Sequence, residues 1–405
     1  MNILFMEMQH QNLPLMKKLV EDGNTVYTTQ HMDNREYLEY FGIKPVDKFP
    51  YLQWDGGEVN RYSEMVGLPI VQEIIEELKL DLIWCSAPSQ AHLLDKYLDD
   101  FPIINTTEQS RMLETKKLFA RTFAEGCGIK APKILAQGDN HIDLDASELP
   151  TPFVVKPKSI WHSSCIVHDT GMWEQRKENY LQVPMEYYVE ELVKGQETNI
   201  SYIMSDGKWA FTFSESCDES LAKRIEYNNP LAWFRNTTVE QMTPELDKRV
   251  RDNVVGYLNE AAKLGGTYEG SITQMLGEDN ELYFLENNVR PYTHNSFPIP
   301  FGGNEYLDAF RNNPQKIGDW FEGRHFPKLT MQSLTIENPL STTIIQYPFH
   351  LHEKYGVHVP TGLQYINGEF ILDSGAVILV FEDEINMDFV EEMKKETNLI
   401  PYFGE

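Results

Sequence analysis

Short apolar runs and helical periodicities alternate along the first hundred residues. The run NILFMEM predicts a strand, LPLMKKLVEDG a helix that stops at a glycine, and NTVYTT a second strand. Helical spacing returns at Ile70, Val71, Ile74, Ile75 and Leu78, before the apolar run LDLIWCSAP. Because strands that alternate with helices form parallel sheets, we expect a small parallel α/β domain over about residues 1–105. No G-x-G-x-x-G follows the first strand, so a dinucleotide fingerprint is absent.

The pattern changes at residue 106. The segment TTEQSRMLETKKLFARTFAEGCGIKAP predicts one helix, opened by a Thr/Glu capping pattern and closed near Gly128. The runs FVVKPKS and CIVHD predict strands, and paired strands are expected around EGSITQML and LYFLENN, after a helix over about 244–264. We therefore expect a second domain of mixed α+β character over about residues 106–330.

The tail, about residues 331–405, is predicted to be rich in strands. In GLQYINGEFILDSGAVILVFED, Asn367 and Gly368 stand between alternating apolar residues, which is a strong hairpin signal. We expect a C-terminal β-rich domain here, and the chain as a whole to combine α/β and α+β parts.

The charge balance narrows the class of partner. With 35 Lys and Arg against 62 Asp and Glu, the net charge is −27. Binding to a nucleic-acid backbone relies on clustered cations, so nucleic acid as a bulk ligand is not expected. A small phosphorylated ligand remains compatible, since acidic groups attract the divalent cation that screens it.

Cysteine usage and hydropathy indicate the compartment. The four cysteines form no C-x-x-C pair, so neither a zinc site nor a disulfide framework is predicted. The start, MNILFMEMQH, has no basic region followed by a long apolar run, and no later run reaches the roughly 18 apolar residues that span a bilayer. We expect a cytoplasmic protein without a membrane anchor.

Candidate chemistry gathers in ELYFLENNVRPYTHNSFP, residues 281–298. Glu286 and Asn288 are at i and i+2 of an extended segment, so both point to one face and can hold a hard cation. Arg290 occupies the next position on that face. Two lysines precede this segment, Lys117 in a helix and Lys156 at the end of a strand, and their order along the chain is informative.

A second set of candidate ligands is set aside. His350, His352 and His358 in FHLHEKYGVH include an H-x-H pair that could bind zinc. No third ligand at a familiar spacing accompanies them, so we interpret these histidines as solvated or core residues and assign no metal.

Several sequence motifs, in the same order along the chain, resemble those of the ATP-grasp superfamily. Within it they resemble the phosphoribosylamine-glycine ligase (glycinamide ribonucleotide synthetase) family. LETKKLFARTFAEGCGIKAP is similar to the L-E-G-S-K-x-F-x-K-x-F segment, and LPTPFVVKPKS to the P-x-V-V-K strand. YVEELVKGQETNISYIMSDGK resembles V-E-E-F-L-x-G-x-E-x-S with its D-G turn, and YEGSITQMLGEDNELYFLENNVR the closing hairpin V-x-E-x-N-x-R. The resemblance runs from about residue 81 to 292, and implies an ATP-grasp fold with a lid subdomain at about 118–188.

The resemblance also implies roles for individual residues. Lys117 and Lys156 would contact ATP phosphates, Glu197 would accept the ribose hydroxyls, and Ser163 and Ser164 in the lid loop would donate to phosphate. The backbone of Glu190, Glu191, Leu192 and Val193 would read the adenine edge, with Leu192 packing on the base. Glu286 and Asn288 would hold Mg²⁺, with Mn²⁺ as an alternative ion and Gln274 as a further ligand. Arg290 would stabilise the transferring phosphoryl group.

The motifs that depart from the family pattern are substrate motifs, except for one ATP-binding motif, the lid loop. The glycine-rich loop after the first strand is replaced by MEMQHQNLP, which contains no glycine, and the lid loop reads SIWHSSCIV instead of a glycine-rich run. We therefore expect a carboxylate and an amine other than phosphoribosylamine as small-molecule substrates. Glu7 would pair with an ammonium group, and residues 291–296 would line the other side.

Three interpretations follow. The first is an ADP-forming carbon-nitrogen ligase that acts through an acylphosphate. The second is a non-catalytic ATP-binding regulatory protein, and the third is a divergent glycinamide ribonucleotide synthetase. No Ser/His/Asp nucleophile is evident or needed, because phosphoryl transfer relies on positioning and charge. Glu215, His162 and His294 are candidates for the group that takes the proton of the amine.

Overall fold

The computed structural model describes a large part of the chain in side-chain detail. The described residues are 1–6, 12–29, 38–39, 41–46, 61–85, 91–97, 101–158, 164–180, 184–217, 237–291, 301–326, 329–335, 344–345, 350–355, 363–366, 369–372, 376–382, 386–397 and 400–401. All statements below concern these residues.

The first sheet has five parallel strands in the order β3-β2-β1-β4-β5. The strands are β1 Asn2–Met6, β2 Thr25–Thr29, β3 Lys44–Val46, β4 Leu82–Cys85 and β5 Ile103–Ile104. Between them lie α1 Leu13–Glu21, α3 Arg61–Leu78 and the 3₁₀ turn η2 His92–Tyr97. Each strand and helix predicted for this region is present, because its apolar residues have the period that buries one helix face or a whole central strand.

The largest sheet has eight strands, in the order β14-β13-β10-β11-β12-β15-β19 with β20 paired to β15. Its described pairs are antiparallel. The strands are β10 Gly195–Ser205, β11 Lys208–Cys217, β12 Thr237–Gln241, β13 Thr267–Gly277, β14 Leu282–Asn288, β15 Leu329–Thr335, β19 Ala376–Glu382 and β20 Ile400–Pro401. The sheet therefore joins strands from the predicted second and third domains.

Two smaller antiparallel sheets complete the described strands. One has the order β6-β9-β7-β8, with β6 Ile134–Gly138, β7 Phe153–Pro157, β8 Cys165–Val167 and β9 Tyr187–Glu191. The other has the order β16-β18-β17, with β16 Ile344–Ile345, β17 Leu363–Ile366 and β18 Glu369–Leu372. The pairing of Ile366 with Glu369 confirms the predicted hairpin, whose two turn residues lie outside the described part of the chain.

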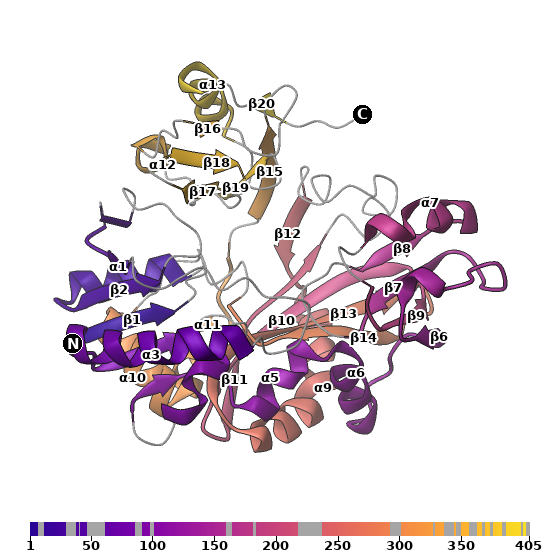
Figure 1. The fold of residues 1–405 in the computed structure, drawn as a ribbon, viewed down its shortest axis with the longest axis horizontal. Helices are drawn as coiled ribbons and strands as arrows, with labels where there is room; N and C mark the ends of the chain where they lie inside the picture. The colour runs from indigo at the N-terminus through magenta and orange to yellow at the C-terminus, as the bar shows by residue number, and fades with distance from the viewer. Residues whose placement is uncertain are drawn as a thin grey trace.

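Helices cover the large sheet and carry the main cores. Figure 1 shows α5, α6 and α9 together beside β10, β13 and β14, and a continuous apolar cluster packs these helices on the strands. A second cluster joins the parallel sheet and α1 to α10 and α11. The bounds are α5 Glu108–Thr115, α6 Lys117–Gly126, η3 His141–Asp143, α7 Thr170–Tyr180, α9 Pro244–Ala261, η5 Ala262–Leu264, α10 Gly303–Asn312, α11 Pro314–Phe321, α12 His350–Tyr355 and α13 Met387–Glu396.

The helix predicted from residue 106 to Gly128 is in fact two helices. Lys116 leaves the helical region (φ −129°, ψ 82°), which ends α5 and starts α6 at Lys117. The capping partner of Thr107 is Ser110, whose hydroxyl accepts from the Thr107 amide at 2.9 Å. Gly128 closes α6 with a φ of +84°, a conformation that glycine adopts without strain. The break has no local glycine or proline, so tertiary packing overrides the helical pattern at this point.

Candidate active site

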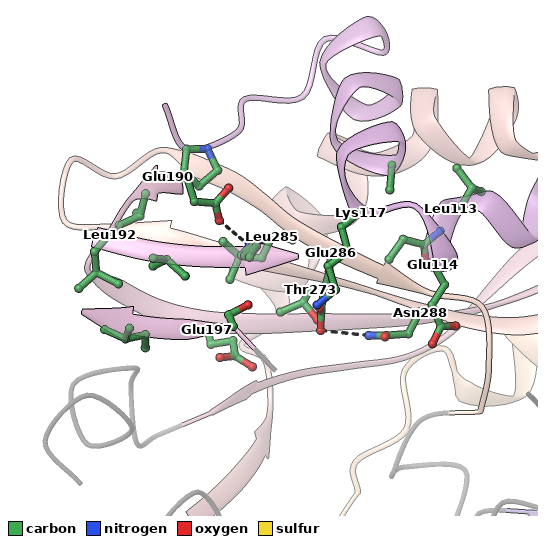
Figure 2. Close-up of a pocket in the computed structure, with 18 of the residues that line it drawn as sticks. Leu113, Glu114, Lys117, Glu190, Leu192, Glu197, Thr273, Leu285, Glu286 and Asn288 are labelled. Atoms are coloured by element: carbon green, nitrogen blue, oxygen red, sulfur yellow. Dashed lines mark hydrogen bonds and ion pairs between the residues drawn. The ribbon is translucent and has the colours of Figure 1, made fainter. Parts of the chain in front are cut away.

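A cavity of about 330 Å³ lies between the small sheet that contains β7 and β9, the β13–β14 hairpin, and helices α5 and α6 (Figure 2). This volume is within the range of small-molecule sites. Most residues singled out in the sequence line it: Lys117, Lys156, Ser164, Glu190, Glu191, Leu192, Val193, Glu197, Glu286, Asn288 and Arg290. Segments up to about 170 residues apart in the sequence are thus brought to one place.

A bulge in β14 decides which side chains face the cavity. Thr273 pairs with Glu286 while Gln274 pairs with Phe284, so Leu285 is an extra residue on β14. As a result Leu285 and Glu286 both line the cavity, whereas Phe284 packs in the core with α9. Asn288 lies two residues after Glu286, on the same face, as its position in an extended strand predicts.

A chain of hydrogen bonds orders this edge of the cavity. The Asn288 amide donates to Glu286 Oε1 at 3.3 Å, and Arg290 Nη2 donates to Asn288 Oδ1 at 3.2 Å. Glu114 of α5 then accepts from Arg290 Nε at 2.8 Å and from the Val289 amide at 2.7 Å. Glu114 was missed from the sequence, although it stands in the quoted LETKK motif, three residues before Lys117.

The two lysines of the cavity lie near different carboxylates. Lys117 Nζ lies 4.0 Å from Glu286 Oε2, while Lys156 forms an ion pair with Glu190 and donates to the Leu285 carbonyl at 3.3 Å. Burial opposes ionisation of Glu286, but the charges of Lys117 and Lys156 outweigh it, so the pKa of Glu286 lies below its ordinary value. Burial lowers the pKa of Lys117, and Glu286 only partly offsets this. The cavity therefore favours a carboxylate that is ionised at neutral pH.

Part of the cavity wall is apolar and reaches the segment 190–193, which the resemblance assigns to the adenine edge. It comprises Leu113, Ala120, Pro132, Val154, Ile166, Leu192, Val193 and Leu285. The side chains of the first two residues of the segment already have partners within the protein. Glu191 Oε1 accepts from the Lys133 amide at 2.8 Å, and the Glu190 carboxylate forms an ion pair with Lys156. Leu192 and Val193 follow the end of β9, so they continue the wall beyond the sheet.

Gln274, predicted as a further ligand of the metal ion, does not lie in the cavity beside Glu286 and Asn288. Its side chain is fully buried, and its Oε1 accepts from Asn253 of α9 at 2.5 Å. Successive residues of a strand point to opposite faces, so Thr273 takes the cavity position and Gln274 points away. The structure therefore does not bring Gln274 to the Glu286–Asn288 pair.

The other candidates are divided between the sheet and the undescribed residues. Glu215 lies buried on β11, outside the cavity lining; burial and the charge of Glu197 hold the pKa of Glu215 well above its ordinary value. Its register partner is Asn199, whose Oδ1 accepts from Thr273 Oγ1 at 2.6 Å, so a polar row runs across the sheet to Glu286. The predictions for Glu7, His162, Ser163, His294 and residues 292–296 lie outside the described residues.

The donor set at the hairpin fits Mg²⁺. Among the described residues, no group of three or more His, Cys, Asp or Glu side chains is placed to hold a metal ion. Mg²⁺ is bound in proteins by one or two carboxylates together with substrate phosphates and water, and it prefers oxygen ligands. Glu286 and Asn288 offer one carboxylate and one amide oxygen beside the cationic side chains.

No helix in the described part of the chain is long and apolar enough to cross a membrane.

Comparison with known proteins adds information on the fold. No family model and no curated protein sequence matches the chain. Among solved structures, an L-amino acid ligase from Bacillus licheniformis is similar with a TM-score of 0.66 and 14% identity, covering 98% of both chains. Phosphoribosylamine–glycine ligase from Thermotoga maritima has a TM-score of 0.63 at 12% identity, covering 98% of this chain and 97% of that chain. The chain has the ATP-grasp fold. Biotin carboxylase from Campylobacter jejuni is a further match, with a TM-score of 0.63, 13% identity, and coverage of 99% of this chain and 92% of that chain.

The ATP-grasp fold confirms the fold class that the sequence predicts. At such low identity the likeness extends to the fold alone, so the roles of the cavity residues and the three domain boundaries stay predictions. Within this ATP-grasp chain, the cavity lies where the small sheet and the β13–β14 hairpin of the large sheet meet (Figure 2).

Proposed function

We propose that the chain is an ATP-dependent ligase that joins a carboxylate to an amine through an acylphosphate, with release of ADP and phosphate. One observation carries the proposal. Lys117, Lys156 and Arg290 line the same cavity as the Glu286–Asn288 pair, together with the apolar part of the wall. That combination suits a nucleotide, with the wall for the base, the cations for the phosphates, and the oxygen pair for Mg²⁺.

The chemistry needs position and charge rather than a protein nucleophile. An oxygen of the substrate carboxylate attacks the γ-phosphorus, a new P–O bond forms, and the bond to the bridging oxygen breaks to release ADP. The amine then attacks the acyl carbon, phosphate leaves, and a base takes the proton of the amine. Lys117 and Lys156 would hold the phosphates, and Arg290, oriented by Glu114, would offset charge on the transferring group.

The Glu286–Asn288 pair would hold Mg²⁺, which supplies a divalent charge that neutralises the phosphate oxygens. Glu286 is suited to this because the charges of Lys117 and Lys156 keep its pKa below the ordinary value. Mn²⁺ would serve in its place, since it accepts the same oxygen ligands.

The amine is proposed not to be phosphoribosylamine. In FMEMQHQNLPLMKK no glycine supplies a backbone cradle for a ribose phosphate, and Pro14 removes one amide donor at the start of α1. An amino acid or another small amine brings no phosphate to this end of the molecule. The L-amino acid ligase among the similar structures has a name consistent with such a substrate class. A cytoplasmic location remains part of the proposal.

The test has two parts. Calorimetry with a non-hydrolysable ATP analogue should show binding that is tighter with Mg²⁺ than without it. ADP release is then measured with a panel of amino acids and polyamines, beside phosphoribosylamine generated in situ with glycine. Turnover with members of the panel supports the proposal, while turnover with phosphoribosylamine and glycine would establish the synthetase activity instead.

Glu260→Ala serves as the matched control in both parts. Glu260 is half exposed on α9, forms an ion pair with Lys263 three residues along the chain, and is not among the described residues that line the cavity. Absence of analogue binding in the wild-type protein would refute the nucleotide site. Binding without ADP release on any substrate pair would instead favour a non-catalytic ATP-binding protein.

A further inference from the structure

Lys156 is held by an ion-pair network at the wall of the cavity. Its ammonium group pairs with Glu190 on the neighbouring strand β9, and Glu190 Oε2 also accepts from Arg121 Nη1 at 3.0 Å. The side chains of Lys156, Glu190 and Arg121 are 8%, 4% and 7% exposed. One carboxylate is therefore shared by two cations in a site from which water is largely excluded.

The network connects the elements that carry the two lysines of the cavity. Arg121 is one helical turn after Lys117 on α6, and Glu190 and Lys156 are on paired strands of the small sheet. The contact of Arg121 with Glu190 thus ties the helix of the first lysine to the strand of the second. A shift of α6 against the small sheet would change the separation of both positive charges.

The charge count explains why a second cation is useful. If Glu190 paired with Lys156 alone, the pair would be neutral and the lysine would offer little net charge to a phosphate. With Arg121 the three buried groups carry a net positive charge on the side of Lys156 that faces the cavity, because the Glu125 carboxylate that also pairs with Arg121 is 45% exposed and is screened by water. Arginine suits this role because its guanidinium stays charged when buried and bonds in a fixed plane.

Burying the ion pairs of Lys156, Glu190 and Arg121 costs the folded protein free energy. Burying an ion pair costs desolvation energy, and Arg121 Nε is buried without a hydrogen-bond partner among the described residues. Arg121 Nη2 is further fixed by Glu125, one turn along α6, at 3.0 Å. A residue needed only to fill space would not require a charged group in this position.

We propose that Arg121 is a positioning residue for ATP phosphates, which acts through Glu190 on the charge and position of Lys156. The proposal rests on the proposed function, because it assumes that the cavity binds a nucleotide. Arg121 itself does not line the cavity, so its effect is indirect.

The experiment compares binding of a ligand with phosphates and one without. Affinities for a non-hydrolysable ATP analogue with Mg²⁺ and for adenosine are measured by calorimetry in wild type, Arg121→Met, Arg121→Gln and Arg121→Lys. The Met and Gln variants should bind the ATP analogue about tenfold more weakly, with adenosine affinity within about twofold, the scale of coupling within one ion-pair network. Arg121→Lys restores the charge and should recover part of the loss.

Arg111→Met is the matched control. Arg111 is also a buried arginine, on α5, paired with Asp95 at 2.6 Å, but neither residue lines the cavity. Arg111→Met should lower the stability of the fold. It should leave the ratio of the affinities for the ATP analogue and for adenosine unchanged. In a Lys156→Met background, Arg121→Gln should cause little further loss for the ATP analogue, because the group through which it acts has been removed.

Three results would overturn the inference. They are an unchanged ATP-analogue affinity in Arg121→Gln, an equal loss for both ligands, and full additivity with Lys156→Met. The glutamine side chain in Arg121→Gln can still donate a hydrogen bond to Glu190. If Arg121→Met does not fold, the affinities of Arg121→Gln therefore test the inference. If the wild-type protein fails to bind the ATP analogue, the proposed function fails with it, whereas wild-type binding with an unaffected variant refutes only the role of Arg121.

Discussion

The two faces of the β13–β14 hairpin make opposite uses of polar side chains. On the cavity face, Glu286 and Asn288 are bonded to each other and to Arg290, and they border a space that a ligand can enter. On the core face, Asn287 is 2% exposed, accepts from the Tyr202 hydroxyl at 3.0 Å and donates to the Tyr257 hydroxyl at 2.9 Å. Burial raises the pKa of both tyrosines well above the ordinary value, so each stays a neutral hydrogen-bonding group.

The difference shows how one strand serves stability and chemistry together. A buried amide is stable only when its donor and acceptor are satisfied inside the protein, which the two tyrosines accomplish. A carboxylate at the cavity instead needs neighbouring cations to remain ionised, and it gains partners when a ligand arrives. Because the bulge at Leu285 sets the alternation, both faces depend on the same backbone register.

The largest expected effect is on the core face. Phe284→Ala removes a side chain that is 2% exposed and packs near Tyr257, with ring centroids 5.7 Å apart. The free energy of unfolding should fall by about 3–5 kcal/mol, because transfer energy is lost and a cavity remains. Denaturant unfolding measures this, and a loss below about 1 kcal/mol would contradict the assignment of Phe284 to the core.

The second prediction concerns the cavity face. Glu286→Ala should reduce ADP release by about 100-fold or more, since contacts to the metal and phosphates commonly supply roughly 2–4 kcal/mol of transition-state stabilisation. Its unfolding free energy should change less than that of Phe284→Ala, because the Glu286 side chain is 41% exposed. ADP release and unfolding are measured on the same preparation. Near-normal turnover would place the metal elsewhere.

The smallest effect is expected for Asn287→Leu. This change removes two hydrogen bonds and leaves the Tyr202 and Tyr257 hydroxyls without that partner, at a cost of about 1–3 kcal/mol in unfolding free energy. Asn287 also lines the cavity, but turnover should fall far less than in Glu286→Ala, since the Asn287 side chain bonds to the core tyrosines. The comparison of the two faces would be wrong if Asn287→Leu kept full stability but lost turnover.

Sequence patterns predicted the elements of the site better than its contacts. The same-face spacing of Glu286 and Asn288 was sufficient, because both lie after the bulge and alternation holds between them. Gln274 was placed on the right strand, but the face it presents depends on register with β14. A shift of one residue reverses the face, and nothing in the local sequence marks Leu285 as the extra residue.

The missed residues share a physical reason. Glu114 bonds to Arg290 and Arg121 bonds to Glu190, across 176 and 69 residues of the chain respectively. Each also resembles an ordinary charged helix residue, which in most proteins is solvated. Their roles appear only once the helices are packed against the hairpin and the small sheet.

The sequence by itself determined the elements, which follow from local periodicity and turn chemistry. Its ordered motifs, through their resemblance to the ATP-grasp superfamily, also pointed to the fold class and to most of the residues that line the cavity. Only the tertiary structure decided the break between α5 and α6, the face of Gln274 and the network around Arg121. Helix breaks of this kind, strand register and buried ion pairs are set by the packing of segments far apart in the chain, and that packing leaves no mark on the residues beside them.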